Sequence, residues 1–268
     1  WRFLGWKVLF MVVSSVKTRP RWWGLEFNDV TFIYPDGEEA VIKNVSFKAK
    51  KGETIAFIGS TGSGKSTLIN LIPRFYDVTS GSIKIDGVDV RDFQLKSLRK
   101  KIGFIRQKNL LFTGSIKSNI KFGKHEASYD EIVHSAKVAQ AYDFISKKEK
   151  GFDEPIGEGG ANVSGGQKQR LSIARALVRK PEIYIFDDSF SALDFKTDAI
   201  LRAELKKETT DAIVLIVAQR IGSIMDADKI IVLDEGEVVG IGKHKELLKT
   251  CSIYKEIALS QLTEEELA

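Results

Sequence analysis

The sequence has a single cysteine, Cys251. One thiol excludes an internal disulfide and offers no cysteine cluster to a metal ion, so we expect a reducing, cytoplasmic setting. Long blocks of one charge are also missing: 41 basic and 36 acidic residues are mixed along most of the chain and leave a formal net charge of +5. Charges mixed in this way indicate a solvated surface, and we expect no nucleic-acid partner.

Long hydrophobic runs are scarce. The unbroken apolar run near the N-terminus covers residues 8–13, far fewer than the roughly 20 residues that cross a bilayer. Because Arg2 and Lys7 precede this run and Ser14 follows it, a signal peptide is one interpretation. An irregular leader, or the end of a longer polypeptide, is the other. The composition, 43% hydrophobic and 29% charged over 268 residues, suffices for one large or two small domains.

A glycine-rich stretch at residues 59–67, GSTGSGKST, matches G-x-x-x-x-G-K-[ST] at every fixed position. An apolar strand pattern precedes it at 54–58 and a helical pattern follows at 67–72, which is the context that this phosphate-binding motif requires. Its glycines permit left-handed or crowded backbone, so successive N–H groups can point at phosphate oxygens. The alternative is a surface turn that happens to contain a lysine.

Two side chains of this loop are expected to bind the nucleotide phosphates and the metal ion. Lys65 should reach the β- and γ-phosphates of a nucleotide, and the Ser66 hydroxyl should bind Mg²⁺. The other loop residues expected to bind the nucleotide are Gly59, Ser60, Thr61, Gly62, Ser63, Gly64 and Thr67.

The segments around the loop predict an α/β fold with additions. Alternating apolar residues at 25–34 and 45–49 predict antiparallel strands, and a hairpin-like stretch follows at 82–86. From about 128 to 180, apolar residues recur with a helical period, which predicts a helical insert. Strands and helices then alternate, as in a parallel α/β core. The strands are expected at 183–186, 213–217, 230–233 and 238–241, and the helices at 196–207, at 221–225 and from residue 243.

The strand at 183–186 ends in two carboxylates, Asp187 and Asp188. Because ligands collect at the carboxyl ends of strands in an α/β sheet, Asp187 should emerge beside the phosphate loop and hold Mg²⁺, directly or through water. A turn or a helix N-cap would be the ordinary role of such a residue on its own. Beside a phosphate loop, the metal role completes a phosphoryl-transfer site.

Ser164, Gly165, Gly166 and Gln167 open a predicted helix that runs through Arg175. Ser164 and Gln167 have the spacing of a capping box, which alone could explain both residues. Two glycines beneath the serine are more than a cap needs. Because they leave N–H groups open at the positive end of the helix, we expect a second anion site there.

Taken together, these residues make the chain resemble the nucleotide-binding domain of ATP-binding cassette (ABC) transporters over about residues 25–258. The matching motifs are the Walker A loop at 59–67, the Walker B strand at 183–188, the signature at 164–167 and the D-loop at 191–194. The resemblance also gives Gln107 as the Q-loop residue, with catalytic and metal-binding roles, and Tyr34 as the aromatic that stacks on adenine. It implies a P-loop NTPase (RecA-like) core, an antiparallel β subdomain and a helical, signature-bearing subdomain at about 115–180.

In this family two such domains sit head to tail, and each ATP lies between the Walker A loop of one and the signature helix of the other. The resemblance therefore implies ATP and Mg²⁺ as cofactors and a second nucleotide-binding domain as partner. Ser164, Gly165 and Gly166 should then contact the γ-phosphate that the partner binds.

Two departures from the family pattern lie at the expected catalytic site. Asp188 stands where the family usually has a glutamate general base, and its carboxylate is one methylene shorter, a deficit of roughly 1.5 Å, so water would be poorly activated. Gln219 replaces the usual switch histidine, and an amide cannot titrate near neutral pH. We expect a slow, degenerate ATP site whose intact signature serves a different subunit carrying Glu and His. A homodimer in which Asp188 works slowly is the alternative.

Residues 107–120 resemble the exporter segment after the Q-loop, with Ser118 in place of a usual glutamate. The adjacent Leu110, Leu111 and Phe112 should pack against the coupling helices of a transmembrane domain. The resemblance thus implies the energy-coupling ATPase of an exporter at the cytoplasmic face of the cell membrane. A soluble ABC ATPase acting on nucleic acid or in translation, and a regulatory domain without turnover, are the alternatives.

The expected organisation is a leader or linker at 1–24, an ABC nucleotide-binding domain at 25–262 and a tail at 263–268. With this function a signal peptide is disfavoured, because the domain would find no ATP outside the cell.

Overall fold

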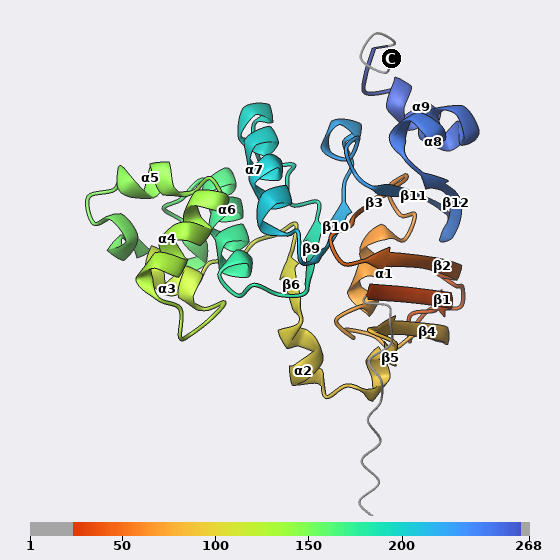
Figure 1. Cartoon of the computed structure of the whole chain (residues 1–268), viewed down its shortest axis with the longest axis horizontal. Coiled ribbons are helices and arrows are strands. Elements are labelled where there is room, and N and C mark those ends of the chain that lie inside the picture. The colour runs from red at the N-terminus through yellow and green to blue at the C-terminus, as the bar shows by residue number, and fades with distance from the viewer. Residues whose placement is uncertain (1–23, 264–268) are drawn as a thin grey trace, which may run out of the picture.

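The computed structural model describes residues 24–263, so the predicted leader and tail lie outside the described residues apart from Gly24 and Thr263. Two sheets lie side by side, and a group of helices extends away from them (Figure 1). Helix α1 (Lys65–Leu71) contributes apolar residues to the core that joins the two sheets. This is the predicted P-loop α/β architecture with an antiparallel sheet and a helical addition.

The larger sheet has six strands in the order β12-β11-β3-β10-β9-β6. Its strands are β3 (Thr54–Ile58), β6 (Ile102–Ile105), β9 (Ile183–Asp187), β10 (Ile213–Val217), β11 (Lys229–Asp234) and β12 (Glu237–Gly242). All neighbouring pairs are parallel except β11 with β12. The inner strands are almost wholly apolar because both faces of the sheet are covered.

Strand β3 shows how the larger sheet divides the core. Ile55 and Phe57 pack in a cluster with α1 and the antiparallel sheet, whereas Ala56 and Ile58 pack in the cluster of the helices on the other face. Successive side chains of a strand point to opposite faces, so four apolar residues in a row, 55–58, serve both clusters. The phosphate loop therefore follows a strand whose last four residues are buried.

The antiparallel sheet has the strand order β2-β1-β4-β5. Its strands are β1 (Gly24–Phe32), β2 (Ile42–Lys50), β4 (Ser80–Ile85) and β5 (Val88–Asp89). The register pairs Phe27 with Phe47, and their rings stack with centroids 4.5 Å apart. The strands and the hairpin predicted from the alternating pattern are confirmed.

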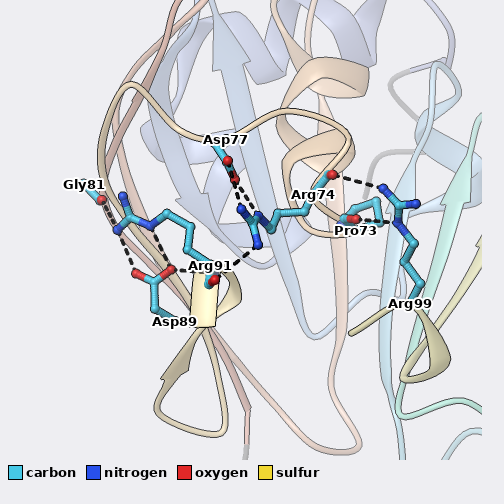
Figure 2. A network of polar contacts seen from close by, with 7 residues as sticks. All are labelled: Pro73, Arg74, Asp77, Gly81, Asp89, Arg91 and Arg99. Carbon is cyan, nitrogen blue, oxygen red and sulfur yellow. Dashed lines mark hydrogen bonds and ion pairs between the residues drawn. The ribbon is translucent and has the colours of Figure 1, made fainter. Parts of the chain in front are cut away.

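Arginines fasten the segment between α1 and β4 (Figure 2). Arg74 Nε lies 2.6 Å from Asp77 Oδ1, and Arg74 Nη1 donates to the carbonyl oxygen of Arg91 at 3.2 Å. Arg99 Nη2 donates to the carbonyl oxygen of Arg74 at 3.2 Å, which connects helix α2 (Leu95–Lys100) to the same segment. The network holds in place the turn that carries the half-exposed ring of Phe75.

The predicted helical insert is present. Its elements are α3 (Ile116–Lys121), α4 (Tyr129–Val138), α5 (Tyr142–Ser146) and α6 (Gly165–Leu177), with the short strands β7 (Gly114–Ser115) and β8 (Pro155–Ile156). Outside it lie α2 (Leu95–Lys100) and α7 (Phe195–Glu208). Within residues 24–263, no helix is both long enough and apolar enough to cross a bilayer.

Two predicted helices differ from the structure. Residues 221–225 form only one 3₁₀ turn, η4 (Ile221–Ser223), because so short a segment containing Gly222 does not offset the cost of helix nucleation. The terminal helix is two, α8 (His244–Thr250) and α9 (Ser252–Leu259), separated by Cys251 with φ −125° and ψ 107°. This break lets α9 bury its own apolar face.

Candidate functional site

Three neighbouring parallel strands end together at one edge of the larger sheet. The register pairs Val217, the last residue of β10, with Asp187 on one side and Phe57 on the other. The segments that follow, which contain the phosphate loop, Asp188 and Gln219, therefore leave the sheet side by side. Parallel sheets bind their ligands at this edge.

The phosphate loop depends on glycine for its shape. Gly64 is the N-cap of α1 with φ 94°, and a Cβ there would lie 2.7 Å from Ile42 Cδ1 and 2.9 Å from the carbonyl oxygen of Val41. A Cβ on Gly59 would lie only 2.0 Å from the carbonyl oxygen of Leu233. The crowded, left-handed backbone that the motif predicts is confirmed at these positions.

The Lys65 ammonium group turns back into the loop. Its Nζ donates to the carbonyl oxygens of Gly59 and Ser60 at 2.9 and 2.7 Å and to Ser63 Oγ at 3.2 Å. Burial lowers the pKa of Lys65, and the nearby carboxylate of Asp187 opposes this effect. The loop thus holds a cation at the place where a phosphate anion would pair with it.

Ser66 and Asp187 offer hard oxygen ligands to a cation. Ser66 Oγ donates to Asp187 Oδ1 at 2.8 Å. Burial raises the pKa of Asp187, while the hydrogen bond from Ser66 and the charges of Arg106 and Lys65 oppose the shift. Mg²⁺ typically takes one or two protein carboxylates and completes its shell with substrate phosphates and waters. Hydroxyl and carboxylate beside a phosphate loop fit such an ion.

Asp188 lies within reach of two side-chain amides. Its Oδ2 accepts from Gln107 Nε2 at 2.8 Å and from Gln219 Nε2 at 3.3 Å. Its φ of 47° is uncommon for a residue other than glycine, and its N–H donates to the carbonyl oxygen of Val217 at 2.9 Å. Burial raises the pKa of Asp188, the Gln107 hydrogen bond opposes this, and the charge of Asp187 adds to it.

These groups line one cavity of about 530 Å³. The predicted residues in its lining are Gly59, Ser60, Thr61, Gly62, Gly64, Lys65, Ser66, Thr67, Gln107, Asp187, Asp188 and Gln219. Ser63 is buried beneath the loop instead. Sequence reasoning missed Ile257, Ser260 and Gln261, which reach the cavity from the end of α9. No motif marks them, because their place depends on how α9 packs.

Tyr34 lies at the side of the loop, outside the lining of that cavity. Its hydroxyl and Thr67 Oγ1 are hydrogen-bonded at 2.9 Å. The ring packs edge-on against Phe32 and Tyr76, with centroids 4.8 and 5.2 Å away. Stacking of Tyr34 on adenine stays a prediction.

Comparison with known proteins identifies this combination of loop, strand and fold. The family model described as ABC transporter matches residues 42–191. The chain belongs to the ABC transporter family. It is a nucleotide-binding domain of the ABC type, which is an ATPase domain that binds ATP.

The relatives of this ABC domain include longer proteins. A putative multidrug export ATP-binding/permease protein of Staphylococcus aureus is 46% identical over 233 residues, 87% of this chain and 40% of that protein. The uncharacterized ABC transporter ATP-binding protein YfiB of Bacillus subtilis is 49% identical over 241 residues, 90% of this chain and 42% of that protein. A solved bacterial Atm1-family ABC exporter with ATP bound has a TM-score of 0.85 and 36% identity over 88% of this chain and 42% of its own. The chain thus spans about 40% of the length of the S. aureus relative.

The signature of this ABC domain begins helix α6. Ser164 Oγ accepts from the N–H of Gln167 at 3.3 Å, and Gln167 Oε1 accepts from the N–H of Ser164 at 3.1 Å, so the predicted capping box is confirmed. Gly165 is exposed, and a Cβ on Gly166 would lie 3.2 Å from the carbonyl oxygen of Ala192 in the D-loop. None of these four described signature residues lines the Walker A cavity.

The Q-loop connects the two halves of the ABC domain. Beyond Gln107, Asn109 Nδ2 donates to Gln169 Oε1 of the signature helix. Arg175 Nη1 of the same helix donates to the carbonyl oxygen of Leu110 at 3.0 Å. The segment after β6 is therefore fixed to α6.

A groove of about 400 Å³ runs beside the Q-loop. Its lining includes the cationic residues Arg106, Lys108, Arg175 and Arg179 and the aromatic residues Phe75, Phe104, Phe112 and Phe122. Among the described residues, no acidic side chain lines it. Leu110 and Phe112 are 71% and 47% exposed, as predicted for a docking surface.

Leu111 corrects the prediction for this segment. It is 3% exposed and packs in the domain's own core, so it is not available to a partner. Ser118, the other departure in the segment, closes a capping box at the start of α3: its Oγ accepts from the N–H of Ser115 at 2.9 Å, and its N–H donates to Ser115 Oγ at 3.0 Å. A serine is sufficient for this local role.

Proposed function

We propose that this domain drives an exporter by closing against a second nucleotide-binding domain around ATP. The observation that carries the proposal is the separation of two anion sites within one chain. Lys65 and Asp188 line the Walker A cavity, whereas Ser164 and Gly165 lie outside it. An ATP held by both sites needs two chains, so ATP joins the interface and loss of its γ-phosphate weakens it.

Within its own cavity, each side chain has a role in the proposal. Lys65 pairs with the β- and γ-phosphates, Ser66 and Asp187 hold Mg²⁺ with Gln107 nearby, and Tyr34 stacks on adenine. When bound, Mg²⁺ supplies charge neutralisation of the phosphates. Its fit rests on the 2.8 Å contact between the Ser66 hydroxyl and the Asp187 carboxylate.

We also infer that this site hydrolyses ATP slowly. Asp188 is shorter than glutamate, and its Oδ2 already accepts hydrogen bonds from Gln107 and Gln219. A carboxylate engaged in this way is a poor general base, because catalysis requires its oxygen within reach of the attacking water. The intact signature then serves a partner subunit that carries Glu and His at the corresponding positions.

The groove beside the Q-loop is the proposed contact with a transmembrane domain at the cytoplasmic face of the membrane. Exposed rings in a concave surface suit the apolar side chains of a coupling helix. Four cations with no acidic neighbour in the lining favour an acidic side chain on that helix. Arg175, in the signature helix α6, is hydrogen-bonded to the segment 107–120. A displacement of that segment by the transmembrane domain would therefore also displace α6.

The substrate of such an exporter is proposed from the relatives alone. The S. aureus relative is named a putative multidrug export protein, and we propose amphipathic drug-like or lipid-like molecules as the exported class. A soluble ABC ATPase acting on nucleic acid fits less well, because basic and acidic residues are mixed along the sequence and residues 107–120 resemble the exporter segment after the Q-loop. A homodimer with a slowly working Asp188 is the closer alternative.

ATP hydrolysis by the 268-residue chain tests the proposal. The unmodified chain should bind ATP and turn it over slowly, Asp188→Glu together with Gln219→His should raise turnover at least about tenfold, and Lys65→Ala should abolish ATP binding. Unchanged turnover in the double variant, with weak ATP binding by the unmodified chain, would overturn the degenerate site. Turnover that rises more steeply than protein concentration in the unmodified chain would favour the homodimer.

A further inference from the structure

The side chain of Gln261 makes two hydrogen bonds to the backbone of the loop that carries Gln219. Gln261 follows helix α9, and its Oε1 accepts from the N–H of Ile221 at 2.8 Å. Its Nε2 donates to the carbonyl oxygen of Gln219, also at 2.8 Å. One side-chain amide thus pairs with backbone groups on both sides of Arg220, in the way that a neighbouring strand would.

Gln261 is itself anchored through buried structure. Its N–H donates to the carbonyl oxygen of Ala258 at 3.1 Å. Ala258 and Tyr254 are both 0% exposed, and the Tyr254 hydroxyl lies 2.7 Å from His244 Nδ1, which joins α9 to α8. The position of Gln261 therefore follows that of a packed helix pair.

The loop that Gln261 holds also lies at the ATP cavity, whose lining includes both Gln219 and Gln261. Gln219 Nε2 lies 3.3 Å from Asp188 Oδ2, a longer contact than the 2.8 Å from Gln107 to the same oxygen. A hydrogen bond at this length is near the end of its useful range, so a small shift of the backbone would break it. The place of the loop decides whether Gln219 reaches Asp188.

We propose that Gln261 is a positioning residue for Gln219. It holds the segment 219–221 where the Gln219 amide reaches Asp188, and it couples the helix pair α8 and α9 to the ATP site. A displacement of α9 would withdraw Gln219 from Asp188 without touching the Walker A loop. The inference rests on the proposed function in so far as Asp188 and Gln219 act on bound ATP.

Amide hydrogen exchange of the 268-residue chain without nucleotide tests the grip itself. In Gln261→Ala the Ile221 amide should exchange roughly two- to tenfold faster, the effect of losing one net hydrogen bond. Gln261→Glu keeps the acceptor for Ile221 and should stay within about twofold of the unmodified chain. Glu256→Gln, on the exposed face of α9, is the matched control and should leave Ile221 unchanged.

The NMR signal of the Gln219 side-chain amide tests the coupling. Asp188→Ala gives its position when the contact with Asp188 is lost, and Gln261→Ala should move the signal toward that position. Gln261→Glu, which lacks the donor to Gln219, should move it too, whereas Glu256→Gln should not. A merely structural role of Gln261 would lower stability and leave this signal in place.

Two results would overturn the proposal: unchanged exchange of Ile221 in Gln261→Ala, or a Gln219 signal that stays in place in that variant. Both measurements are made without ATP. If the unmodified chain neither binds nor hydrolyses ATP, the proposed function fails, while the exchange and NMR results still decide the role of Gln261.

Discussion

Ser66 and Asp187 stand 121 positions apart in the sequence, and the hydroxyl of the first donates to the carboxylate of the second at 2.8 Å. Ser66 lies in the first turn of helix α1, and Asp187 ends strand β9. Their contact joins the phosphate loop to the acidic strand end. Either residue alone could serve only the local backbone. Their side-chain oxygens lie together beside the phosphate loop, and this is the observation that favours a bound cation.

Replacing Ser66 tests that pairing. Ser66→Ala removes the hydroxyl, so we expect ATP affinity in the presence of Mg²⁺ to fall at least about tenfold, in line with the loss of a ligand to the ion. Affinity measured with EDTA should change much less. Ser66→Thr retains the hydroxyl and is the control. An equal loss with and without Mg²⁺ would contradict the metal role.

Gly64 should not tolerate a side chain. Gly64→Ala imposes a left-handed φ on alanine and drives its Cβ to 2.7 Å from Ile42 Cδ1. We expect the free energy of unfolding to fall by about 1–3 kcal/mol and ATP binding to weaken. At Gly222, a Cβ would meet no described atom within 4 Å, so Gly222→Ala should stay within about 0.5 kcal/mol. Equal effects in urea denaturation would contradict the argument from close approach.

Asn119 holds the exporter-like segment in shape. Its Oδ1 accepts from the N–H of Phe112 at 2.8 Å, its Nδ2 donates to the carbonyl oxygen of Phe112 at 2.8 Å, and the side chain is 1% exposed. Asn119→Ala removes the hydrogen-bond partner of part-buried backbone groups of Phe112 and should cost about 1–3 kcal/mol of unfolding free energy.

Asn162 supplies the comparison for this loss. Its side chain also bonds backbone, accepting from the N–H of Gly157 at 3.0 Å and donating to the carbonyl oxygen of Pro155 at 2.8 Å, but it is exposed. Water can replace its bonds, so Asn162→Ala should cost clearly less. If denaturation midpoints fall equally, burial is not what makes Asn119 important.

His244 predicts a pH dependence of stability. Burial lowers the pKa of His244 from its ordinary 6.5, so the unfolded chain binds a proton at a higher pH than the folded chain does. The free energy of unfolding should therefore fall as the pH drops below about 6.5, with a slope of at most about 1.4 kcal/mol per pH unit. His244→Gln should flatten this part of the profile. His125 and His134 are present in both proteins, so their contributions cancel when the two pH profiles are subtracted. If the profiles of the unmodified chain and of His244→Gln run parallel, His244 is not the source of the pH dependence.

Much of the ATP site was predictable because it is encoded locally. The glycines at 59 and 64 are needed for backbone shape and close approach, and the capping box of Ser164 and Gln167 closes within one turn of helix. Asp187 required one further rule, that parallel strands end at the same edge of the sheet. Each of these signals lies within a few residues of the feature it predicts.

Other features depended on packing between distant segments. Leu110 and Leu111 are the same residue type in adjacent positions, so the sequence does not distinguish them. Only the packing of Leu111 into the core shows that one is buried and the other exposed. Residues 243–259 show one helical pattern, and the break at Cys251 follows from burial of α9. The sequence by itself determined the family, the phosphate loop and the strand order along the chain, because these rest on local backbone chemistry and periodicity. The tertiary structure alone decided that Gln107 and Gln219 share one oxygen of Asp188 and that Gln261 holds the loop that carries Gln219, because those contacts join segments that lie 31 to 81 positions apart in the sequence.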